Sequence, residues 1–154
     1  MTVRLHGRRA GLDRRRLRSH AVRLLREVGW PRAELSIALV DDAAIAELNA
    51  RYRGIAKATD VLSFAQLAGA QAERRGALLG DVVVSLDTAA VQARRGRRTL
   101  DDEVLRLLIH GTLHLLGHDH ERDDEARRMR AEERRVWRAL HADAAHEQRS
   151  DRRA

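Results

Sequence analysis

The chain is organised around the stretch Leu107–His120, LLIHGTLHLLGHDH, which places four of the eight histidines within eleven residues. His110 and His114 stand four positions apart, so on a helix they project from one face about one turn apart. Gly117 then offers a helix stop, because glycine adopts the left-handed conformation that ends many helices. A turn there lets the chain return a third imidazole toward the first two. Two ligands on a helix and a third after a turn predict a metal site with an open coordination position.

The helical phase favours ligands over ordinary core histidines. With His110 as the reference and roughly 100° per residue, the apolar positions fall on the opposite arc, while His114 lies beside His110. These positions are Leu105, Leu108, Ile109, Thr112, Leu115 and Leu116. The imidazoles therefore share a face that the core does not use.

The third ligand is either His118 or His120, since both follow the turn, and the spacing alone does not choose between them. Three neutral imidazoles leave zinc one position at which water or substrate can bind, so hydrolysis is the natural reaction class. In H-E-x-x-H zinc peptidases, a glutamate after the first histidine serves as general base. Gly111 occupies that position here, so a peptidase mechanism lacks its base.

The hydrophobic pattern of the rest of the chain predicts a small α+β domain. Strands are expected at 2–6, 35–39, 61–64 and 78–85, and helices at 12–28, 87–95 and 123–140, with two more through Ile45–Tyr52 and through the histidine stretch. Thr99 and Asp102 form a capping-box pattern at the start of the histidine helix. Strands alternating with helices and then followed by helices favour a mixed sheet of about four strands rather than a doubly wound one.

The chain is expected to form one domain over residues 1–140. Residues 141–154 are expected to be a disordered polar tail. The segment Gln66–Gly76 is polar and rich in alanine and glycine, which predicts a mobile connection.

The amino-acid composition limits the classes to which the protein can belong. The 154 residues carry a formal net charge of +7 and no cysteine, and Lys57 is the single lysine among 30 basic residues. Disulfides and thiolate metal sites are therefore excluded. Because the chain shows neither a membrane-spanning apolar run nor a signal-peptide core, we expect a cytoplasmic location. The basic excess can attract phosphate groups, although a solvated arginine-rich surface explains the charge equally well.

Hydrolysis of a phosphodiester requires a cation to meet the charge that develops on the phosphoryl oxygens. Arg53 is a candidate, because it closes a helix and opens the loop that leads to Thr59 and Asp60. The alternative is an ordinary exposed arginine near a helix C-terminus. A second basic group, which fits either an RNA backbone contact or a solvated charge run, is Arg94, Arg95, Arg97 and Arg98.

These motifs resemble the YbeY family, the bacterial ribosomal RNA maturation endoribonucleases. Residues 110–120 are similar to its H-G-x-L-H-L-x-G-H-D-H signature. The other similar segments are Leu48–Arg53 (L-N-x-x-Y-R), Thr59–Phe64 (T-D-V-L-S-F), Gly80–Ser85 (G-D-I-x-I-S), and Met129 with Glu133 in the final helix. The resemblance runs from about the second strand to residue 137, and the N-terminal third matches mainly in pattern.

The resemblance implies a zincin-like α+β fold with its metal site on a central helix. It implies one zinc ion (Zn2+) per chain, held by His110, His114 and His120, which leaves His118 outside the first coordination shell. It also assigns the family's functional arginine to Arg53. The implied activity is endonucleolytic cleavage of single-stranded RNA in small-subunit ribosomal RNA maturation and ribosome quality control. The implied partners are RNA and the ribosome or small-subunit proteins, with neither DNA nor membrane.

Two departures from the family pattern and two alternatives accompany this interpretation. Ala58 and Ala65 stand where the family usually has proline, so the loop after Arg53 is expected to be more mobile. The alternatives are a metallohydrolase of another bond and an RNA-binding ribosome assembly factor with a mainly structural zinc. Asp119 and Glu121 lie near the histidines in sequence, and the general base stays unassigned.

Overall fold

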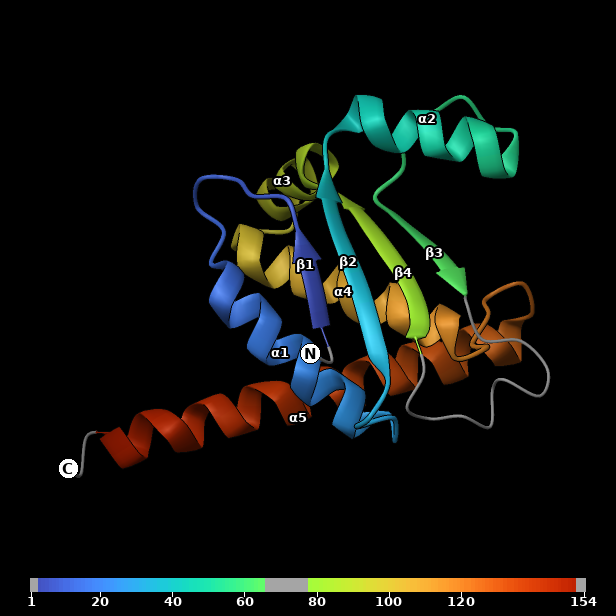
Figure 1. Ribbon diagram of the computed structural model, residues 1–154. Helices are drawn as coiled ribbons and strands as arrows, with labels where there is room; N and C mark the ends of the chain where they lie inside the picture. Colours follow the sequence, from blue (N-terminus) through green and yellow to red (C-terminus); the bar gives the residue numbers. More distant parts are fainter. Residues whose placement is uncertain (1–2, 66–77, 152–154) are drawn as a thin grey trace.

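The computed structural model describes residues 3–65 and 78–151. Within these ranges the chain forms four strands and five helices, which confirms the predicted α+β domain with a small mixed sheet (Figure 1). The elements are β1 Val3–His6, α1 Arg14–Glu27, β2 Glu34–Val40, α2 Asp42–Arg53, β3 Val61–Ala65, β4 Leu78–Ser85, α3 Leu86–Arg95, α4 Leu100–Leu115 and α5 Asp123–Asp151.

The sheet has the strand order β1-β2-β4-β3. β1, β2 and β4 run parallel, whereas β3 pairs with β4 in the antiparallel sense at the edge of the sheet. The apolar run Val82–Val84 lies in β4, between β2 and β3. A strand with neighbours on both sides and helices on both faces buries both sets of side chains, which explains why this run does not alternate with polar residues.

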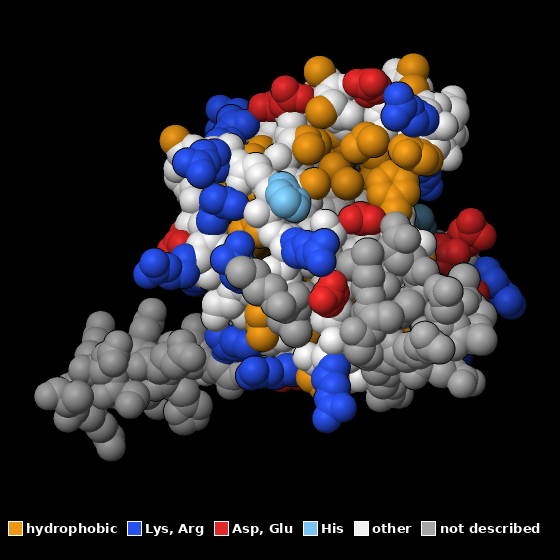
Figure 2. Space-filling view, in the orientation of Figure 1, with side chains coloured by type: hydrophobic (Ala, Val, Ile, Leu, Met, Phe, Trp, Pro, Cys, Tyr) orange, Lys and Arg blue, Asp and Glu red, His pale blue; other side chains and the backbone are white. Residues whose placement is uncertain are grey.

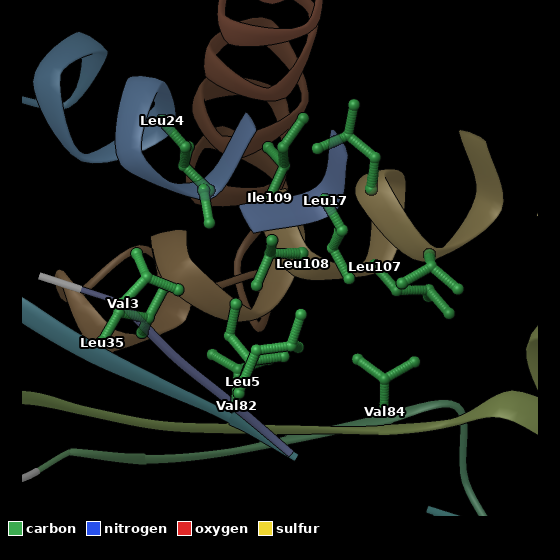
Figure 3. Packing of buried hydrophobic residues seen from close by; sticks show 14 of the residues in the cluster. Val3, Leu5, Leu17, Leu24, Leu35, Val82, Val84, Leu107, Leu108 and Ile109 are labelled. Atoms are coloured by element: carbon green, nitrogen blue, oxygen red, sulfur yellow. The ribbon is translucent and has the colours of Figure 1, made fainter. Parts of the chain in front are cut away.

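Successive residues of β4 pack into two different hydrophobic clusters, one on each face of the sheet. Val82 and Val84 belong to the main core, which they share with α1 and α4. Figure 3 shows this layer, in which Leu17 and Leu24 of α1 lie with Leu107–Ile109 of α4 on one side of the sheet. Val83 points to the opposite face and packs with side chains of α2 and β3. α4 therefore buries its apolar side between the sheet and the helices beside it, and it carries His110 and His114 on a partly exposed side.

α4 packs closely against the sheet at Gly111. The Ser63 hydroxyl of β3 donates a hydrogen bond of 2.8 Å to the Gly111 carbonyl oxygen. A Cβ atom added at Gly111 would lie 2.8 Å from Val82 Cγ1, 3.0 Å from Ser63 Oγ and 3.1 Å from Val61 Cγ2. The position therefore has a packing reason to be glycine, which the sequence pattern did not reveal.

The first turn of α4 is fixed by polar contacts. The Thr99 side chain accepts a 3.1 Å hydrogen bond from the Asp102 amide, as its capping pattern predicted. Glu103 is fully buried and accepts hydrogen bonds from Arg98 and Arg106. Burial alone would raise the pKa of the Glu103 carboxyl, but the two guanidinium groups hold that pKa below its ordinary value. The site helix thus starts from an ionised, fully paired carboxylate.

The last helix differs from the sequence prediction. α5 continues to Asp151, past Leu140, where the apolar spacing ends. Ala142, Ala144 and Ala145 follow, and alanine has the highest helix propensity, which favours continued helical backbone. The division into a domain at 1–140 and a disordered tail at 141–154 stays a prediction, and the expected connection Gln66–Gly76 lies outside the described residues. Over the described part of the chain, none of the helices combines the length and apolarity that a bilayer crossing requires.

Candidate metal centre

The structure brings three of the four clustered histidines together. His110 and His114 project from the last turns of α4, and His120 comes from the segment between α4 and α5. One potential ligand atom from each ring lies within 4.8 Å of the others. His118 stands outside this group, which separates the two histidines that spacing alone left equivalent.

The turn after α4 explains how His120 returns. α4 ends at Leu115, and Gly117 adopts a left-handed conformation with φ 93°. The His118 amide then donates a 3.1 Å hydrogen bond to the Leu113 carbonyl oxygen, which closes the helix end. The chain reverses at this point, so a histidine three residues beyond Gly117 faces the last turn of α4.

The donor set fits a zinc ion. Three imidazole nitrogens, with no described fourth protein ligand in the cluster, are a common arrangement in zinc enzymes. Burial, together with the neighbouring His110 and His120, lowers the pKa of the His114 imidazole. A lowered pKa favours the neutral ring, which is the form that binds a metal.

Glu133 of α5 orients the first of these histidines. Its Oε1 lies 2.7 Å from His110 Nδ1. When Nδ1–H donates to this carboxylate, Nε2 is the nitrogen left to bind an ion, and the ring is held in one orientation. Sequence reasoning placed Glu133 in the final helix without a role. A signal existed: Glu133 lies four residues from both Met129 and Trp137, so a carboxylate interrupts the apolar side of α5.

We expect Glu133→Ala to weaken zinc binding by about 10- to 100-fold, because a carboxylate that orients a ligating histidine typically contributes that much. Competition with a chelating dye measures the affinity. Glu132→Ala is the matched control, since it removes the same charge from a neighbour that pairs with Arg135 instead. Equal zinc affinity in the two variants would show that the Glu133 contact has no such role.

The histidines open onto a pocket of about 680 Å³ that also contains Arg53. Arg53 is exposed at the end of α2, and its side chain has no hydrogen-bond or ion-pair partner among the described residues. Residues 59–65 of the following loop and strand form the adjoining wall. The structure thus places a free guanidinium, far away in sequence, in the same pocket as the three histidines.

Three carboxylates line the pocket, and two of them are already engaged. Asp60 accepts hydrogen bonds from the Val61 amide at 2.8 Å and from Gln92 at 3.3 Å, so it fixes the loop. Asp119 accepts a 2.7 Å bond from the His120 amide. Glu121 is exposed, and no such contact engages it within the described part of the chain.

The second basic group of the sequence lies elsewhere. Arg98 is committed to Glu103. Arg94, Arg95 and Arg97 are exposed around the end of α3. None of these four arginines lines the pocket, so any contact of theirs with an RNA backbone would lie outside it, and both interpretations of this group stay predictions.

The chain is similar in sequence to known proteins over most of its length. A family model described as "Endoribonuclease YbeY" matches residues 9–141. A relative named Endoribonuclease YbeY from Anaeromyxobacter sp. (strain Fw109-5) is 50% identical over 90% of this chain and 72% of its own length. One from Geobacter metallireducens is 41% identical over 86% of the chain and 90% of the relative. The chain covers less of two other relatives, 63% and 35% of their lengths.

A solved structure has a similar fold. The solution structure of TM1509 from Thermotoga maritima superimposes with a TM-score of 0.64 at 26% identity. The match covers 94% of this chain and 93% of that protein. The similarity therefore extends over most of the chain, rather than the histidine motif alone.

Proposed function

The chain belongs to the YbeY endoribonuclease family, and from this premise we propose that it is a zinc-dependent enzyme that cleaves single-stranded RNA during maturation of small-subunit ribosomal RNA. As a member of an endoribonuclease family, the protein is a hydrolytic nuclease. The observation that carries the finer proposal is the pocket in which His110, His114 and His120 lie beside the free guanidinium of Arg53.

Each of these residues has a distinct task in the proposed mechanism. The three histidines would hold one zinc ion per chain, which supplies a Lewis acid and an activated water when it is bound. Arg53 presents N–H donors to the phosphoryl oxygens, where negative charge develops as the phosphodiester is cut. Glu133 keeps the His110 ring in the orientation that the site needs. We class this arrangement as zincin-like, because two ligands share one helix and the third follows a chain reversal.

Two alternatives fit the site less well. A peptidase needs a glutamate where Gly111 stands, and a Cβ atom there would already meet β3 and β4 at about 3 Å or closer. A purely structural zinc normally has four protein ligands and a closed site. The described part of the chain offers three, beside an open pocket and an exposed His120. Both observations favour hydrolysis of RNA.

The wider role is part of the same proposal. Ribosomal RNA is the substrate class that the family implies, and we include ribosome quality control and contact with the ribosome or small-subunit proteins. A cytoplasmic location follows from this substrate. DNA and membranes are not partners in this proposal.

We expect Arg53→Glu to reduce cleavage of single-stranded RNA by at least about 100-fold, since removing one preorganised donor to a developing oxyanion typically has that effect. The charge reversal adds repulsion of the phosphate. The measurement is the initial cleavage rate of a labelled single-stranded segment of precursor ribosomal RNA by zinc-loaded protein.

Arg51→Glu is the matched control for this experiment. Arg51 lies on the same helix, is exposed, has a partner only at the 4.0 Å limit, and does not line the pocket. This variant should cleave like wild type, and circular dichroism should show both variants folded. Cleavage that persists in Arg53→Glu, or in a metal-stripped sample, would contradict the mechanism.

A further inference from the structure

We propose that Tyr52, supported by Phe64, is the platform on which an unpaired nucleobase of the RNA stacks. This inference rests on the proposed function and names the feature of the substrate that the pocket recognises. It assigns the aromatic wall of the pocket, beside Arg53, a role that neither the histidines nor the arginine can fill.

The two rings meet at the pocket from different elements. Tyr52 lies in the last turn of α2, and Phe64 lies in β3. Their ring centroids are 5.2 Å apart, at an interplanar angle of 62°, which is an edge-to-face contact. The protein contains one tyrosine and one phenylalanine, and both line the pocket that holds the three histidines.

Phe64 anchors the pair to the fold. It is half-buried and packs against the smaller hydrophobic cluster of Ile45, Leu62 and Val83. Figure 2 shows hydrophobic side chains gathered on this face below α2. The Phe64 ring is therefore held by its neighbours, and its contact restrains the Tyr52 ring in turn.

Tyr52 itself is largely open to solvent. Its exposed fraction is 62%, the largest among the exposed large hydrophobic residues of the described chain. Its hydroxyl has no hydrogen-bond partner among the described residues. One edge-to-face contact occupies at most one face of the ring, so an aromatic face remains available in the pocket. Apolar surface that is exposed and gathered beside a pocket, as Tyr52 and Phe64 are here, is typical of a binding surface.

The neighbouring residue, Arg53, indicates which ligand this face of the Tyr52 ring would bind. Arg53 follows Tyr52 directly, so a phosphate on the guanidinium brings the bases of the adjoining nucleotides close to the ring. Proteins that bind single strands combine such cationic backbone contacts with aromatic stacking of successive bases. In a duplex, both faces of each base are already stacked, and an isolated ring cannot compete for them. Tyr52 would therefore select unpaired RNA.

The test is binding of full-length, zinc-loaded protein to a short fluorescein-labelled single-stranded RNA with nuclease-resistant phosphorothioate linkages, followed by fluorescence anisotropy. Tyr52→Leu, which keeps an apolar side chain without a ring, should weaken binding by about tenfold, the size expected for loss of one stacked base. Tyr52→Phe should restore binding to within about twofold of wild type, because it keeps the ring. Ile55→Ala is the control, since Ile55 is 51% exposed nearby but does not line the pocket.

A second arm identifies the nucleobase as the partner. In a series of RNAs, each with one abasic nucleotide at a different position, one RNA should bind wild type and Tyr52→Leu equally. As in a double-mutant cycle, the equality arises because this RNA lacks the base that stacks on Tyr52. The stacking role would be overturned if wild type and Tyr52→Leu bound the unmodified RNA equally, or if the Tyr52→Leu defect persisted with every abasic RNA. Neither result would contradict the proposed function. If wild type binds no single-stranded RNA, the proposed function fails together with the stacking role. Tight binding of duplex RNA that depends on Tyr52 would also overturn the platform.

Discussion

Replacing His114 by alanine is expected to empty the metal site and abolish RNA cleavage. The His114 ring lies 4.8 Å from that of His110 and 5.2 Å from that of His120, measured between centroids, so it is the common neighbour of the other two. Structural zinc sites with four ligands gain roughly 10–16 kcal/mol, so losing one ligand of three should cost roughly 3 kcal/mol or more of binding free energy. That is more than about a hundredfold in affinity.

Zinc content per purified chain and cleavage of single-stranded RNA are the two measurements. His118→Ala is the matched control, because it removes an imidazole from the same segment but from outside the cluster. It should keep about one zinc per chain. Full zinc retention by His114→Ala, or equal loss from both variants, would mean that the ligand set is wrong.

The second large effect concerns stability. Gly111→Val is expected to lower the free energy of unfolding by roughly 3 kcal/mol, because overpacking a filled core typically costs about 1–3 kcal/mol. The valine Cβ would sit 2.8 Å from Val82 Cγ1, and Val82 is fully buried in the main core. Valine has better helix propensity than glycine by a few tenths of a kcal/mol, which is too little to offset the clash. Helix α4 must move away from β3 and strain the Ser63 hydrogen bond.

Urea unfolding monitored by circular dichroism measures this change. The control is Ala131→Val at an exposed position of α5, where valine should cost under about 1 kcal/mol through helix propensity alone. A Gly111→Val protein as stable as wild type would show that α4 tolerates a side chain against the sheet. In that case the packing argument against a peptidase would also be lost.

The histidine helix was predictable because its evidence is local. The apolar positions opposite His110 include Leu105, Leu108 and Ile109, and all three are buried in the main core. The helix stop at Gly117 is present with positive φ. These features depend on residues within a few turns of each other, where periodicity and glycine chemistry determine the backbone.

The choice between His118 and His120 was not predictable from spacing. Both residues follow the stop at Gly117, and the conformation of the following residues decides which ring faces α4. The family resemblance named His120, and the structure places His120 with His110 and His114. Their role as ligands, like the role of Arg53, stays a prediction until the variants above are measured.

Contacts between segments far apart in the sequence were the other feature that could not be predicted. The alternation of Leu35, Ile37 and Leu39 predicted a strand, but nothing in the pattern specified the order β1-β2-β4-β3. Pairing depends on contacts between residues tens of positions apart, which single-strand patterns do not contain. Contact between Glu133 and His110 is of the same kind, since it forms only when α5 packs against α4.

The edge position of β3 divides the pocket into two walls of unequal local stability. His110 and His114 belong to α4, whose apolar side is buried in the main core, so this part of the histidine wall opens only with the core, whereas His120 follows the helix in an exposed segment. The wall with Phe64 is held through pairing with a single described neighbour, β4, and Tyr52 and Arg53 precede the loop that leads into this strand. Segments with few partners unfold locally at low free-energy cost, while core elements require global unfolding. The two histidines on α4 are therefore permanent features of the native ensemble, whereas the wall that carries Tyr52, Arg53 and Phe64 can be released and re-formed without disturbing them.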